Sequence, residues 1–162
     1  MSLLALCQWF ENTAVGGAIR ESQWWFPVLE TTHTLGIILM VGTIAVVDLR
    51  LLGVALRREP VSNVTQQLLP WTWIGFTLMF VSGFLLVLSE AVKLYSSPFF
   101  RIKLVLLLLA GLNALVFHFT VYRQVGAWDL ASQTPRRAKA AGLISLACWI
   151  GVIAAGRAIG YE

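Results

Sequence analysis

Charged residues are scarce in this chain of 162 residues, since Asp, Glu, Lys and Arg together make up 12% of it. A soluble domain carries about 25% of these residues, so the chain has roughly half the charge that a water-facing surface requires. The hydrophobic share of 58% points the same way. The composition therefore excludes a soluble enzyme and a disordered chain, and it indicates an integral membrane protein whose first partner is the lipid bilayer.

A basic stripe is also missing. The formal net charge of +4 comes from scattered residues, whereas nucleic-acid binding needs clustered Lys and Arg, so we expect no nucleic-acid partner. Cysteine is equally rare: Cys7 and Cys148 are the only two, no CxxC spacing occurs, and we expect no disulfide between them. The first ten residues lack the basic start and the cleavage pattern of a signal peptide, so no removed leader is expected.

Four long apolar runs are present, and aromatic residues typical of a membrane interface border them. At about 20 residues per crossing, they predict an all-α fold, a four-helix transmembrane bundle over residues 27–162. The spans are expected at about residues 27–52, 69–95, 98–122 and 138–161. Residues 57–67 and 123–137 are expected to connect them. Residues 1–26 form an N-terminal segment, in which residues 2–18 predict a short helix lying in the membrane interface.

Lysine and arginine are distributed unevenly between the two sides of the expected bundle. Seven lie on the side of the two polar connectors, namely Arg50, Arg57, Arg58, Arg123, Arg136, Arg137 and Lys139. Five lie on the side of the termini, namely Arg20, Lys93, Arg101, Lys103 and Arg157. Cytoplasmic loops carry the excess of positive charge. We therefore expect a multi-pass protein of the bacterial inner membrane with both termini in the periplasm.

Five ionisable side chains fall near the outer end of the spans, on the side of the termini. Counted at about 1.5 Å per helical residue, all of them lie within about two turns of that surface. They are Glu30, His33, Glu90, Lys103 and Arg157. Ionisable groups inside a membrane normally face the bundle interior and pair with one another. The five therefore predict an inward-facing polar layer.

The opposite end carries a second polar set. Asp48 and Arg50 close the first span, and we interpret them as charges that reach the membrane surface. Asn113, in the third span, predicts a hydrogen bond between helices.

The two histidines invite comparison with small membrane cytochromes, in which two histidines hold one haem. His33 is six residues beyond Pro27 and His118 is twenty beyond Pro98, so their depths differ by about 21 Å. One iron requires its two axial nitrogens about 4 Å apart, and a haem joining the two histidines is therefore not expected. His33 and Lys103 differ by one residue in depth. Lys103 would serve as a second axial ligand in its neutral form, or as the cation that holds a haem propionate.

Three interpretations of the polar layer stay open. It is a structural ion-pair network that holds the helices in register, or a cofactor site with haem b on His33, or a proton or ion path through Glu30, His33 and Glu90. The cofactor interpretation predicts a membrane protein of electron transfer or oxidation, with quinone or a redox protein as candidate electron partner. The alternatives are a non-catalytic subunit or anchor of a larger membrane complex or homo-oligomer, and a metal or proton transporter.

Several runs of residues resemble known families. Over nearly the whole chain, an uncharacterised family of bacterial four-span proteins is similar in the runs Glu30-Thr-Thr-His33-Thr-Leu-Gly36, Asp48-Leu-Arg50-Leu-Leu-Gly53, Pro70-Trp-Thr-Trp-Ile-Gly75-Phe and Lys103-Leu to Asn113-Ala-Leu-Val-Phe-His118. Over two helices, the four-helix membrane protoporphyrinogen oxidases and the copper-resistance D family are similar in the order His33, Gly36, Gly42, Arg50, Leu51, Lys103, Leu104 and His118. This second resemblance implies haem binding at His33 and Lys103, with His118 the weaker candidate ligand. The chain lacks the tryptophan-phenylalanine-alanine-glycine run that follows the histidine in those oxidases.

Overall fold

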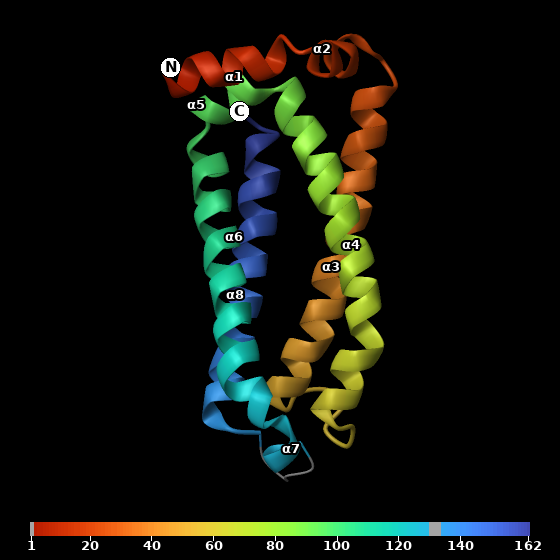
Figure 1. Cartoon of the computed structure of the whole chain (residues 1–162), viewed down its shortest axis with the longest axis vertical. Helices are drawn as coiled ribbons and strands as arrows, with labels where there is room; N and C mark the ends of the chain where they lie inside the picture. Colours follow the sequence, from red (N-terminus) through yellow and green to blue (C-terminus); the bar gives the residue numbers. More distant parts are fainter. Residues whose placement is uncertain (1, 130–133) are drawn as a thin grey trace.

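The computed structural model describes residues 2–129 and 134–162, and helices make up most of this part (Figure 1). The described residues include no strand. Four helical segments are long and apolar enough to cross a membrane. They are α3 (Trp25–Leu52), α4 (Val61–Ser89), a third segment over Pro98–Trp128 that begins with α6 (Pro98–Val116), and α8 (Arg136–Ile159). The expected all-α membrane bundle is confirmed, and the chain is an integral membrane protein.

The four long segments pack as two pairs. α3 lies against α4, and α6 lies against α8, while contacts between α3 and α8 join the pairs. Both termini lie at the same end of the bundle (Figure 1). The opposite end holds α7 (Val125–Trp128) and the start of α8. Large apolar side chains are exposed on all four segments, for example Ile38, Phe80, Leu108 and Ile150, as expected of helices that face lipid.

Glycines bring α3 and α4 close enough for their backbones to touch. A Cβ at Gly36 would lie 2.7 Å from the backbone nitrogen of Met79. A Cβ at Gly75 would lie 2.6 Å from the backbone nitrogen of Met40. Small residues at helix contacts are what membrane helices use to pack, because lipid gives no hydrophobic force between them. This contact fixes the separation of the α3–α4 pair.

α4 begins earlier than its hydropathy predicts. The span was expected over residues 69–95, but the helix begins at Val61 and ends at Ser89. Asp129 provides the physical reason, because its carboxylate accepts hydrogen bonds from the backbone nitrogen of Ser62, at 3.0 Å, and from the hydroxyl of Ser62. This carboxylate caps the first turn of α4 from a distant part of the chain. The polar residues 61–67 are therefore helix, and the expectation that they form a connector is wrong.

The N-terminal segment forms two helices rather than one. α1 (Leu3–Glu11) and α2 (Ala14–Glu21) lie across the end of the bundle (Figure 1). Below α1 lies α5 (Ala91–Ser96), whose residues were expected within the second span. The carboxylate of Glu11 accepts a hydrogen bond from the backbone nitrogen of Val92 at 2.8 Å, and this bond ties α1 to α5.

The third segment changes its helical geometry near its end. α6 continues as a π-helical turn over Phe117–Val121, a 3-10 turn over Tyr122–Gln124, and then α7. The expected end at residue 122 falls within this series. The expected connector over residues 123–137 is partly helical, and its residues 130–133 lie outside the described part. The first and fourth spans begin within two residues of their expected starts.

Candidate functional site

His33 is held by α4 through one of its ring nitrogens. Nδ1 lies 3.0 Å from the carbonyl oxygen of Met79 and 3.2 Å from the hydroxyl of Ser82. A carbonyl oxygen can only accept a hydrogen bond, so Nδ1 is the nitrogen that carries the proton in this contact. In the neutral ring, Nε2 is then left with a lone pair. Gly83 makes room for the ring, because a Cβ there would lie 2.8 Å from the Cε1 of His33.

Lys103 occupies a matching position on the other helix pair. Its side chain extends from α6 along α8, where a Cβ at Gly156 would lie 3.4 Å from Nζ. The residue is half-buried. Among the residues that the structure describes, none forms a hydrogen bond or an ion pair with its ammonium. Each pair therefore contributes one polar side chain, packed against a glycine, near the end of the bundle that holds the termini.

The other three residues of the expected polar layer do not join this region. Glu30 is exposed on α3. Glu90 pairs with Lys93, one turn away, at 4.0 Å. Arg157 is exposed, and its guanidinium lies over the ring of Tyr161 at 5.0 Å. No ion pair between the spans occurs in the described part of the chain, so the interpretation as an ion-pair network that holds the helices in register is wrong.

His118 lies far from His33. It belongs to the π-helical turn at the opposite end of the bundle, where it is exposed and stacks on Tyr122 with ring centroids 5.5 Å apart. The structure therefore agrees that the two histidines do not share a ligand. The described residues contain no group of three or more His, Cys, Asp or Glu side chains arranged to hold a metal ion. A haem requires only one or two protein ligands, so this finding does not bear on haem.

Sequence reasoning missed the burial of Asp48 and Arg50. Asp48 is 5% exposed and Arg50 is 6% exposed, so the interpretation that they reach the membrane surface is wrong. The Nε of Arg50 donates to the carbonyl oxygen of Glu59 at 2.6 Å, and its Nη1 donates to the hydroxyl of Thr134 at 3.5 Å. Arg50 therefore ties the end of α3 to the segments that precede α4 and α8.

α8 packs tightly against α3 beside Asp48. A Cβ at Gly142 would lie 3.1 Å from the carbonyl oxygen of Asp48. Nearby on α8, the carbonyl oxygen of Ala141 accepts a hydrogen bond from the Nδ2 of Asn113 at 3.0 Å. The predicted interhelical hydrogen bond of Asn113 is confirmed. Gly142, two turns into α8, was the sequence signal for this close approach, because a glycine permits helix backbones to come together.

The comparisons with known proteins give the family of the chain. A family model, described as a family of unknown function (DUF6644), matches residues 9–162. The chain belongs to this family. No curated protein and no solved structure matches the chain. The expected resemblance to an uncharacterised family is therefore confirmed in this form, and the resemblance to the membrane oxidases and the copper-resistance D family stays a prediction.

Proposed function

We propose that this DUF6644 protein binds haem b in the membrane and acts in electron transfer or oxidation, with His33 as an axial ligand. The hydrogen bond between the Nδ1 of His33 and the Met79 carbonyl oxygen carries the proposal. A metal-ligating histidine almost always donates its other ring N–H to a carbonyl, a carboxylate or water. This contact orients the ring and leaves Nε2 to bind the iron.

Lys103 is the second residue of the proposed site. Glu90, a carboxylate of the expected polar layer, pairs with Lys93. Lys103 is thus available either to hold a haem propionate by its charge or to bind the iron when neutral. Bound haem would supply one-electron chemistry, with quinone or a redox protein as electron partner. The protein's own contribution is to hold and orient the imidazole, to supply a cation at the same end of the bundle and to surround both with apolar helices.

We also infer that the protein lies in a bacterial inner membrane with both termini in the periplasm. The two termini share one end of the bundle (Figure 1). The excess of Lys and Arg lies at the other end, where positive charge favours the cytoplasm. In this orientation His33 and Lys103 lie in the periplasmic half of the membrane.

The visible absorption spectrum of the purified protein tests the haem proposal. We expect a Soret band with reducible α and β bands, which the His33→Ala variant loses while it still inserts in the membrane. His118→Ala is the matched control, because it removes the other histidine from the opposite end, and it should keep the spectrum. Gly83→Ala should disturb the spectrum because the new Cβ collides with the imidazole ring.

The same experiment separates the proposal from its alternatives. An unchanged haem content in His33→Ala would contradict the assignment of the ligand. A protein that takes up no haem, either in the cell or when haem is added during purification, would favour a membrane anchor or a transporter.

A further inference from the structure

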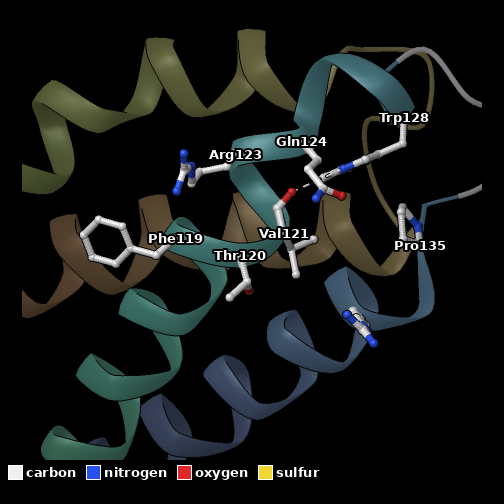
Figure 2. A pocket seen from close by; sticks show the side chains of 8 residues that line it. Phe119, Thr120, Val121, Arg123, Gln124, Trp128 and Pro135 are labelled. Atoms are coloured by element: carbon white, nitrogen blue, oxygen red, sulfur yellow. Dashed lines mark hydrogen bonds between the residues drawn. The ribbon is translucent and has the colours of Figure 1, made fainter.

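A half-open hollow lies at the end of the bundle opposite the termini. Its volume is about 480 Å³. Three parts of the chain line it: the π-helical and 3-10 turns after α6, then α7, and the start of α8. Figure 2 shows that Trp128 of α7 and Pro135, just before α8, flank it on one side, and that Phe119 lies on the other. The indole nitrogen of Trp128 donates to the carbonyl oxygen of Val121 at 3.4 Å and so holds α7 against the π-helical turn.

Two arginines give the hollow a positive charge. Arg123 and Arg137 both line it, and both are exposed. Within the described ranges, neither guanidinium forms an ion pair or a hydrogen bond with the protein. Two unpaired guanidiniums beside one hollow form a favourable site for a phosphate group, since their planar forks match its oxygens.

The start of α8 adds to this charge. α8 begins at Arg136 after Pro135, and its first turn has no acidic residue and no side chain that caps it. The first backbone N–H groups of a helix carry a partial positive charge. Cations near these groups are therefore unfavourable, whereas an anion is stabilised there. A bound anion would therefore stabilise a helix start that no acidic or capping side chain among the described residues compensates.

The hollow is also continuous with the lipid-facing side of α6. Phe119 lines it and is 62% exposed. Leu115 and Leu112, one and two turns earlier on the same helical segment, are exposed as well. Tryptophan at the end of a span is typical of the headgroup level of a membrane. The hollow therefore combines a cationic region at headgroup level with an apolar surface that leads into the membrane.

We propose that this hollow binds the headgroup phosphate of an anionic phospholipid. Arg123 and Arg137 hold the phosphate oxygens, and an acyl chain lies along Phe119 and the exposed face of α6. A free phosphate would use the two arginines but would leave this apolar surface without a role. The site is independent of the proposed haem site, which lies at the other end of the bundle.

Ligand-dependent thermal unfolding in a neutral detergent tests the proposal. Dioleoylphosphatidylglycerol should raise the unfolding midpoint of the full-length protein. Dioleoylphosphatidylcholine and inorganic phosphate at the same concentrations should not. Since each arginine near an anionic lipid contributes about fivefold, the R123Q/R137Q variant should bind phosphatidylglycerol about 30-fold more weakly.

The R57Q/R58Q variant is the matched control, because it loses the same charge at the same end of the bundle from exposed positions outside the hollow. It should keep the affinity of the unchanged protein. If the double variant R123Q/R137Q has no cooperative transition, R123Q and R137Q are measured singly, with a fivefold loss expected for each. Equal stabilisation by phosphatidylcholine, an equal loss in R57Q/R58Q, or the full shift with inorganic phosphate alone would overturn the proposal.

Discussion

The carbonyl oxygen of Gly36 lies 3.0 Å from the point that a Cβ at Gly75 would occupy, and the carbonyl oxygen of Gly75 lies 3.1 Å from the corresponding point at Gly36. The two glycines thus form a reciprocal contact between the backbones of α3 and α4. His33 is one turn away from Gly36 and reaches the Met79 carbonyl across the same narrow interface. The separation that the glycines allow is therefore also the one that the hydrogen bond of His33 needs.

Gly36→Ala and Gly75→Ala should each destabilise the protein by about 1–3 kcal/mol, the usual cost of extra volume in a well-packed contact. The obstacles are backbone atoms, which cannot move aside as a flexible side chain can. Gly42→Ala is the matched control, because it lies on the same helix and nothing is within 4 Å of its new Cβ. It should be neutral or stabilising, since alanine favours a helix over glycine by about 1 kcal/mol. Chemical unfolding in detergent measures all three, and equal effects at Gly36 and Gly42 would contradict the contact.

Asp129→Ala should shift the start of α4 by removing its cap. We expect a loss of about 1–2 kcal/mol in the free energy of unfolding, because the backbone nitrogen and the hydroxyl of Ser62 both lose their acceptor. Ser62→Ala should cost less, and the double variant should show coupling between the two sites. Asn63→Ala, an exposed position on the same turn, serves as the control. Additive losses from Asp129 and Ser62 would argue against the cap.

Arg50→Gln should destabilise the protein by about 1.5–3 kcal/mol, the range for hydrogen bonds to a charged group. The guanidinium is buried, and its two bonds join the end of α3 to segments that are far apart in the chain. Arg58→Gln, at an exposed site near the same end, should change the stability by less than about 0.5 kcal/mol. Thermal unfolding measures the stability of both variants. Equal losses of stability in Arg50→Gln and Arg58→Gln would contradict a structural role for Arg50.

The orientation of the bundle can be measured with fusions at the C-terminus. An alkaline phosphatase fusion should be active and a green fluorescent protein fusion should be dark, because the excess of Lys and Arg at the opposite end favours the cytoplasm for that end. Moving the two reporters to the segment between α3 and α4 should reverse both signals. The reverse result for the C-terminal fusions would place His33 and Lys103 in the cytoplasmic half of the membrane.

The four spans could be predicted, because hydropathy is a local property and a span needs a fixed number of helical residues. The direction of each side chain could not. Glu30 is only three residues before His33, yet it is exposed while His33 is half-buried. α3 packs mainly against α4 and α8, so a side chain one step around the helix already faces outward. A count of depth does not reveal which faces of a helix are covered.

The start of α4 and the burial of Arg50 were missed for a different reason. Each depends on partners that are distant in the sequence, Asp129 for Ser62 and Thr134 for Arg50. Residues 57–67 look like a connector by composition, because polar residues in membrane proteins usually lie in loops. A carboxylate supplied from a distant part of the chain caps the first turn of α4, and this cap cannot be read from the local composition.

The bond between Glu11 and Val92 also bears on the order in which the protein is made. The two residues are 81 positions apart, so α1 cannot take its place until α5 has been synthesised. The packing of α2 likewise needs the end of α4, because Gly16 of α2 is packed against the carbonyl oxygen of Leu88. α1 and α2 are synthesised first, but they reach their final positions only after α4 has been inserted. Until then, their exposed apolar side chains Leu3 and Trp9 can bind the membrane surface.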